Sequence, residues 1–244
     1  MEWQAPAVVL EVRPYGEGAA IVTLLTEAQG RHAGLAKGGS SRGQAALWQP
    51  GNLIEARWVG RLADQLGAVS GEMVHAAAAQ AMDDPLALAL LSSACAIAAD
   101  ALPEREPHPL PFRGLVSLIG HLAGGAEGVI ADYVRWEALL LADLGYGLDL
   151  ARCAVTGASD GLTHVSPRSG RAVSAAAAAP YAGRLLDLPA FLLDEGGLGD
   201  PAAWLAGLRL TGHFLERDAF GARHRPLPPA RGLLVDRVTA LAER

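Results

Sequence analysis

The sequence is poor in lysine, in cysteine and in long uncharged runs. Lys37 is the only lysine, beside 19 arginines, and Cys95 and Cys153 are the only cysteines. Two cysteines cannot build the disulfide framework of a small secreted domain, which favours a reduced, cytoplasmic protein. The longest segment without a charged residue, 85–99, has 15 residues, fewer than the roughly 20 that cross a bilayer. We therefore expect no membrane span, and the first residues show no signal-peptide pattern.

The overall composition is that of a folded protein with a modest acidic excess. Hydrophobic residues make up 51% of the chain and charged residues 19%. A sizeable core can therefore form, which excludes disorder over most of the length. The net charge of −6 argues against a protein that is basic over its whole surface.

The first 75 or so residues show the alternation of short β-strands. Apolar and other residues alternate over 8–12, 21–26, 31–37 and 54–59, and glycine-rich turns separate several of these segments. Short strands at intervals of about ten residues are typical of a small barrel, and a small β-sandwich is the alternative.

From about Ala76 the apolar positions follow a helical period. An acidic cap followed by Pro85 opens the first such segment and Pro103 closes it, which are common start and stop signals. Helices are expected over 86–102, 112–122, 129–144, 201–217 and 230–244, with an irregular segment at 148–175. The sequence predicts an α+β protein with a β domain at 1–78 and a larger, mostly helical domain at 79–244.

Positive charge gathers in the β segment. Between Arg31 and Arg61 there are five basic residues and one acidic residue, a net charge of +4, whereas the rest of the chain carries −10. Cations attract phosphate, and the rings of Trp48 and Trp58 offer stacking surfaces for bases. The alternative is a hairpin loop with solvated charges above two core tryptophans. The basic residues of this window are Arg31, Lys37, Arg42, Arg57 and Arg61.

No motif of an enzyme active site is visible. The seven histidines lack metal-ligand spacing, the serines lack a G-x-S-x-G context, and no glycine-rich phosphate loop is present. Cys153 occupies the place of a zinc knuckle, but a closed zinc site needs four Cys or His ligands. We expect no catalysis, no metal and no cofactor. A second basic cluster, from Arg217 to Arg231, is either a solvated loop between helices or a contact for an acidic partner.

Several segments, in this order, resemble the bacterial recombination mediator family RecO. The opening hairpin and the L-G-Y end of a long helix carry much of the resemblance, which covers nearly the whole chain. The matching segments are A-V-V-L at 7–10 with A-I-V-T-L-L-T at 20–26, G-R-H-A-G-L-A-K-G at 30–38, L-W-Q-P-G-N at 47–52, W-E-A-L-L-L-A-D-L-G-Y-G at 136–147, D-L-A-R-C-A-V-T-G at 149–157 and P-R-S-G-R-A-V at 167–173.

The resemblance implies an N-terminal oligonucleotide-binding (OB) fold, a helical C-terminal domain and no enzymatic activity. Proteins of this family bind single- and double-stranded DNA, anneal complementary strands and work with RecR to load RecA. The resemblance thus assigns DNA binding to the basic window and places the protein in the cytoplasm, at the nucleoid. The alternative is an adaptor that binds only proteins and uses the barrel for docking.

Family members also bind the acidic, hydrophobic tail of single-strand DNA-binding protein. For that tail we expect an apolar groove between C-terminal helices with a cation at its rim. The candidate cations are Arg113, Arg135, Arg217 and Arg223.

Some members hold zinc with two C-x-x-C pairs, and this sequence departs from that pattern. Cys153 is present, Thr156 stands at the second position, and the later pair is missing around Ser169-Gly170. The resemblance therefore does not lead us to expect zinc here.

Overall fold

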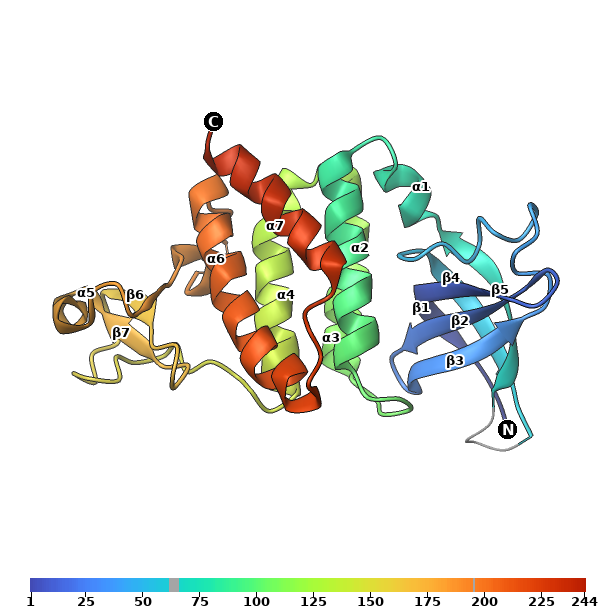
Figure 1. Ribbon diagram of the computed structural model, residues 1–244, viewed down its shortest axis with the longest axis horizontal. Coiled ribbons are helices and arrows are strands. Elements are labelled where there is room, and N and C mark those ends of the chain that lie inside the picture. Colours follow the sequence, from blue (N-terminus) through green and yellow to red (C-terminus); the bar gives the residue numbers. More distant parts are fainter. Residues whose placement is uncertain (62–65, 195) are drawn as a thin grey trace. The chain divides into compact units, whose positions relative to one another are not determined.

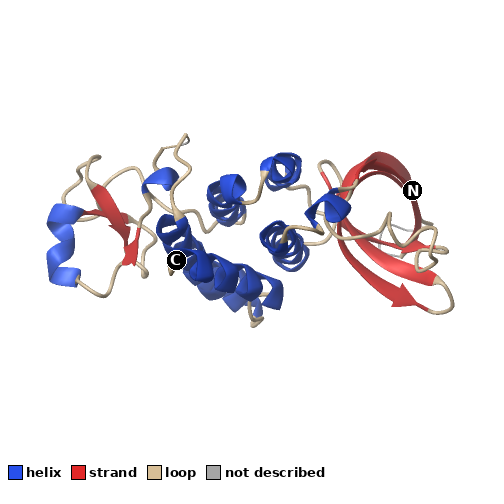
Figure 2. Ribbon diagram, turned by 90° about the horizontal axis from the view of Figure 1, so that it is seen from above, coloured by secondary structure: helices blue, strands red, loops and turns tan. Residues whose placement is uncertain are grey.

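The computed structural model describes residues 1–61, 66–194 and 196–244. The chain divides into two compact units, Met1–Ala126 and Glu127–Arg244, whose elements are drawn in Figures 1 and 2. Within the described residues, the first unit holds a β barrel and three α-helices, and the second holds further helices and a small sheet. The predicted α+β class, with the barrel preceding most of the helices, is confirmed.

Five strands form the barrel. They are β1 (Glu2–Tyr15), β2 (Ala19–Thr26), β3 (Gly30–Ala36), β4 (Leu53–Val59) and β5 (Gly67–His75). The barrel closes in the order β1-β2-β3-β5-β4, with a short parallel pairing between β3 and β5 and antiparallel pairing elsewhere. The expected barrel, and not the sandwich, is therefore present.

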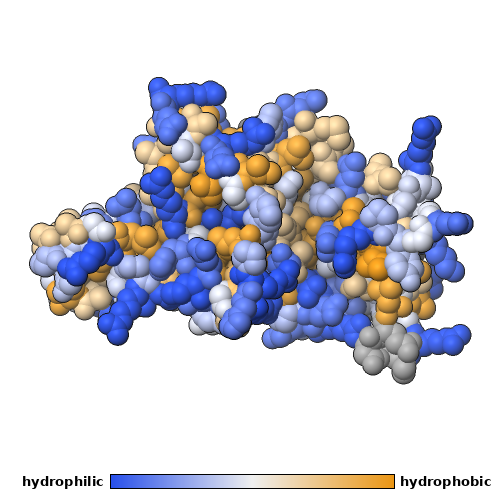
Figure 3. All heavy atoms as spheres, in the orientation of Figure 1, coloured by the Kyte–Doolittle hydropathy of each residue, from blue (hydrophilic) through white to orange (hydrophobic). Residues whose placement is uncertain are grey.

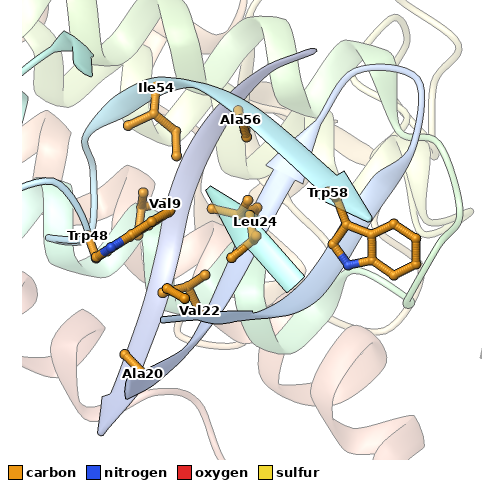
Figure 4. Close-up of a cluster of buried hydrophobic side chains, with 11 residues drawn as sticks. Val9, Ala20, Val22, Leu24, Trp48, Ile54, Ala56 and Trp58 are labelled. Atoms are coloured by element: carbon orange, nitrogen blue, oxygen red, sulfur yellow. The ribbon is translucent and has the colours of Figure 1, made fainter. Parts of the chain in front are cut away.

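The barrel interior is filled by apolar side chains from alternate positions of the strands (Figure 4). Trp48 and Trp58 are both only 2% exposed and belong to this core. A Cβ atom at Gly67 would lie 2.3 Å from the indole of Trp58, so the barrel needs a glycine there to enclose the ring. The interpretation of these two tryptophans as stacking surfaces for bases is wrong, and the core alternative is right.

Local signals set the ends of the helices in the first unit. These helices are α1 (Ala77–Ala81), α2 (Pro85–Ala101) and α3 (Pro109–His121), with a 3₁₀ turn at Leu122–Gly124. The carboxylate of Asp84 accepts hydrogen bonds from the N–H groups of Leu86 and Ala87, at 2.9 and 3.2 Å, which caps α2 as its sequence predicts. Cys95 on α2 is a core residue that is 1% exposed, and this burial raises the pKa of its thiol to about 12.

The second unit contains helices and a three-stranded sheet. Its helices are α4 (Ile130–Asp143), α5 (Ala175–Ala178), α6 (Pro201–Phe214) and α7 (Pro229–Ala242), with a π-helical turn at Leu215–Phe220 and 3₁₀ turns at Glu127–Val129, Ala179–Tyr181, Ala190–Leu192 and Gly221–Arg223. The sheet order is β7-β6-β8, from β6 (Leu162–Val165), β7 (Ala172–Ser174) and β8 (Leu186–Asp187). Two of these short strands lie in the segment expected to be irregular.

A buried ion pair joins α4, α6 and α7. Glu137 is 0% exposed and Arg231 is 5% exposed. The Nε of Arg231 donates to Glu137 Oε1 at 2.7 Å, and its Nη2 donates to Oε2 at 2.9 Å. Tyr133 and Thr211 also donate to this carboxylate. The interpretation of Arg231 as part of a solvated or partner-binding cluster is therefore wrong.

Among the residues that the structure describes, no helix has both the length and the apolar character needed to cross a membrane.

Candidate nucleic-acid interface

One row of polar side chains crosses the exterior of the barrel. Arg57 on β4 lies opposite Ser70 on β5 and opposite Gln4 on β1. Lys37 directly follows the last paired residue of β3, at the level of Ser70. Neighbouring strands are separated by roughly 4.8 Å, so the backbones of Lys37 and Arg57 are about 10 Å apart. Two long cationic side chains can thus approach the same short stretch of a polyanion.

A groove of about 400 Å³ lies between these two cations. Its lining combines apolar and polar side chains, and hydrophobic and hydrophilic residues also lie side by side on the visible face of the barrel in Figure 3. Trp48 contributes little to this surface, because it is 2% exposed. The apolar lining residues are Leu35, Trp48, Val59, Ala68 and Val69, and the others are Lys37, Gln44, Arg57, Ser70 and Gly71.

The structure brings together only some of the basic residues between Arg31 and Arg61. Lys37 and Arg57 line the groove, and the exposed Arg42 lies in the loop that contains Lys37 and Gln44. Arg61 is exposed just beyond the end of β4.

Arg31 lies apart from this group. It is six residues from Lys37 along β3, which corresponds to about 20 Å in an extended strand. Its Nε donates to the carbonyl of Leu102, at the end of α2, at 2.9 Å. Arg31 therefore contacts the helical part of the first unit rather than the groove.

Ion pairing divides the groove cations into two kinds. Arg57 donates through Nε and Nη2 to the same carboxylate oxygen of Glu2, both at 2.6 Å. This bond lowers the pKa of Glu2 and raises that of Arg57. Lys37 and Arg42, by contrast, have no ion-pair partner among the described residues. The loop with Lys37 and Arg42 therefore holds the accessible positive charge.

The fold holds this loop in place at both ends. The Ser40 hydroxyl donates to the carbonyl of Ala19 at 2.7 Å, which ties the loop to the start of β2. At the other end, the buried amide of Asn52 donates to the carbonyl of Ala46 at 2.8 Å. Asn52 also accepts from the N–H of Ala78 at 3.1 Å. These contacts limit the positions that the loop cations can take.

Sequence reasoning missed the acidic border of the groove. Glu55 lies opposite Glu72 on the face that carries Arg57, and Glu2 lies on that face as well. The alternation of β4 places Glu55 beside Arg57, but only the strand register brings Glu2 and Glu72 next to them.

An exposed aromatic ring was missed too. Tyr15 is 54% exposed and pairs with Ala19, the residue to which the loop is tied. Its ring, and not the buried tryptophans, offers a stacking surface near the loop.

Comparison with known proteins identifies the family to which this chain belongs. The family model described as "Recombination protein O N terminal" matches residues 1–77, and "Recombination protein O C terminal" matches residues 82–226. The chain is 57% identical over 244 residues to the DNA repair protein RecO of Granulibacter bethesdensis, which covers 100% of this chain and 98% of that protein. It is 60% identical over 247 residues to that of Gluconacetobacter diazotrophicus, covering 99% and 96%.

The chain belongs to the RecO family. It is therefore a DNA repair and recombination protein, and its family is one of recombination mediators without enzymatic activity. This membership, rather than any missing motif, confirms the resemblance and the expected class of function.

Two of the arginines expected to bind a partner of RecO have structural roles in the second unit. Arg135 donates to the carbonyls of Phe191 at 3.1 Å, Asp194 at 3.0 Å and Gly197 at 2.5 Å, and it pairs with Asp132 at 2.6 Å. These bonds fasten the segment before α6 to α4.

Arg217 is the second arginine with a structural role. It pairs with Asp218 at 2.7 Å, donates to the carbonyls of Pro167 and Arg168, and lies 4.8 Å above the ring of Phe214. It therefore ties the irregular segment to the end of α6.

The other two candidate arginines are more exposed. Arg113, in the first unit, pairs with Glu27, and its side chain is 66% exposed. Arg223, in the second unit, lies in an exposed 3₁₀ turn. The four candidates are thus spread over both units.

The residues at the place of the RecO zinc knuckle do not fit a zinc ion. Cys153 is 1% exposed, and its Sγ accepts hydrogen bonds from the N–H and hydroxyl of Ser174, at 3.3 and 3.4 Å. Bonds from Ser174 and Thr156 lower the pKa of this thiol to about 6. The structure thus places Ser174 beside Cys153. Within the described ranges, no group of three His, Cys, Asp or Glu side chains could hold a metal.

Proposed function

We propose that this chain binds single-stranded DNA across the barrel row that contains Lys37, Ser70 and Arg57. The observation that carries the proposal is the groove, which is lined by two cations together with apolar side chains. Phosphates would contact Lys37 and Arg57, and a base or sugar would cover exposed apolar side chains such as Val59 and Ala68. Contacts of this kind give affinity without reading the base sequence.

The same contacts support annealing of complementary strands. Annealing requires no covalent step, because neutralised phosphate backbones repel each other less and strands held near one surface meet more often. The rest of the chain is acidic, with a net charge of −10 outside the 31–61 window. This charge would confine DNA to the basic part of the barrel, so that residues 1–78 serve as the DNA-binding domain.

The partners that we propose follow the family. They are single- and double-stranded DNA, RecR and the acidic tail of single-strand DNA-binding protein, which the chain would help to displace when RecA is loaded at the nucleoid. For the tail, Arg113 and Arg223 are more accessible than Arg135 and Arg217, whose guanidinium groups hold the fold together.

A strand-annealing assay tests the proposed function. Complementary labelled oligonucleotides should anneal faster with the purified protein than without it, and the gain should fall as salt rises because phosphate contacts are electrostatic. A pure adaptor would bind its protein partners and show no salt-sensitive DNA affinity. That result would overturn the proposal.

We further propose that the knuckle around Cys153 folds without metal, because hydrogen bonds from Ser174 and Thr156 take the place of metal bonds. The purified protein should contain well below one zinc per chain by elemental analysis. A chelator should change neither its annealing rate nor its thermal unfolding. A stoichiometric zinc content, or a loss of stability on chelation, would contradict this.

A further inference from the structure

Glu2 occupies the side of Arg57 that a phosphate would need. The two charged groups are 52% and 56% exposed, so neither is held by burial. The ladder between β1 and β4 places Glu2 opposite Val59 and Gln4 opposite Arg57, which keeps Glu2 on the exterior face beside the guanidinium. A carboxylate and a phosphate both accept hydrogen bonds from a guanidinium in this way.

Two further carboxylates lie near the pair of Glu2 and Arg57. Glu55 and Glu72 face each other across β4 and β5, and both line a hollow that also contains Gln4, Arg57 and Ser70. Like charges placed opposite each other destabilise a sheet, so the pair adds nothing to the barrel's stability. Arg57 therefore has carboxylates on both sides along the strands, with Glu55 two residues before it on β4 and Glu2 opposite Val59, two residues after it.

We propose that Glu2 is an intramolecular competitor for the DNA phosphate at Arg57, and thus a residue that sets how tightly the groove holds a strand. This inference rests on the proposed function of the groove. In the free protein Glu2 neutralises Arg57. When a strand arrives, its phosphate displaces Glu2, and the acidic pair Glu55 and Glu72 repels the strand from the part of β4 and β5 two residues beyond Arg57 and Ser70.

The exchange explains how the groove releases a strand. A bound phosphate at Arg57 always competes with a carboxylate that is already in place at high local concentration. The strand therefore dissociates more readily than it would from a groove whose cations were all unpaired. A protein that passes strands to another protein requires such reversible binding.

The test compares Glu2→Gln with the unmodified protein in single-stranded DNA binding over a range of salt. The variant should bind about two- to fivefold more tightly at low salt, the effect expected from one exposed ion pair. The same phosphate contacts Arg57 in both proteins, so the slope of log affinity against log salt should change by less than the roughly 0.7 expected for a whole phosphate contact. The change should be toward a steeper slope, because the variant has no displaced carboxylate that takes up a cation from solution when the strand binds.

Two further variants give the control. Asp83→Asn makes the same change in net charge in the turn before α2, outside the groove, and should have less effect. In an Arg57→Ala background, Glu2→Gln should have no effect, since the cation for which Glu2 competes is gone. An equal effect of Glu2→Gln and Asp83→Asn, or an undiminished effect without Arg57, would overturn the inference.

The outcomes separate this inference from the proposed function. If the unmodified protein has no salt-dependent affinity for DNA, both fail. If it binds DNA and loses affinity when Lys37 is reversed in charge, but Glu2→Gln acts like Asp83→Asn, only the competitor role fails.

Discussion

Replacing Glu137 by alanine should lower the free energy of unfolding by about 3–5 kcal/mol, the range found when one partner of a buried ion pair is removed. The change leaves Arg231 buried and without its carboxylate, and it removes the acceptor of Tyr133 and Thr211. Burial disfavours the charged form of Arg231, but Glu137 raises its pKa above the ordinary value overall. The variant lacks Glu137 and keeps the burial, but an arginine side chain does not lose its proton in proteins, so the guanidinium stays charged at a high energetic cost.

Urea unfolding followed by circular dichroism measures this loss. The control is a double variant, Glu137→Met with Arg231→Met, which removes both charges and keeps apolar volume. It should be less destabilised than Glu137→Ala, because a buried ion pair adds little net stability over well-packed apolar residues. A loss below about 1 kcal/mol in the single variant would show that this ion pair does not hold α4, α6 and α7 together.

Reversing the charge of Lys37 and Arg42 together, to glutamate, should weaken single-stranded DNA binding roughly tenfold or more at low salt. Both side chains lie in the loop beside the groove and lack ion-pair partners among the described residues, so their full charge is available to phosphate. The loss of two phosphate contacts should also flatten the slope of log affinity against log salt by about 1.4.

Fluorescence anisotropy with a labelled oligonucleotide at several salt concentrations gives both quantities. Arg209→Glu with Arg237→Glu is a matched control, since it makes the same net charge change at exposed positions on α6 and α7. An unchanged affinity and slope in a folded Lys37/Arg42 variant would refute the site. An equal loss in the control would mean that net charge, rather than the loop, governs binding.

Local features of the fold were predictable from the sequence, and features that depend on distant partners were not. Asp84 and Pro85 predict the start of α2 because a helix cap involves neighbouring residues only. The partner of Arg231 lies 94 residues away, so nothing in the local pattern shows that this arginine is buried.

The same distinction holds for the candidate site. The charge pattern singled out Lys37 and Arg57, which the barrel brings into one groove. It could not separate Arg31 from them, because that depends on where the end of α2 meets β3. It also overstated the accessible charge, since Glu2 pairs with Arg57 across 55 residues of sequence. The strand register, which the sequence leaves open, decides which of these charged side chains lie next to each other on the barrel.

The position of β5 has a consequence for synthesis on the ribosome. This strand is the last of the barrel along the chain, yet it lies between β3 and β4 and hydrogen-bonds to both. A nascent chain that ends before β5 carries two open strand edges, which can pair with other chains. The barrel can thus close only after residue 75 has been synthesised, and a fragment that ends before β5 exposes two strand edges through which it can aggregate.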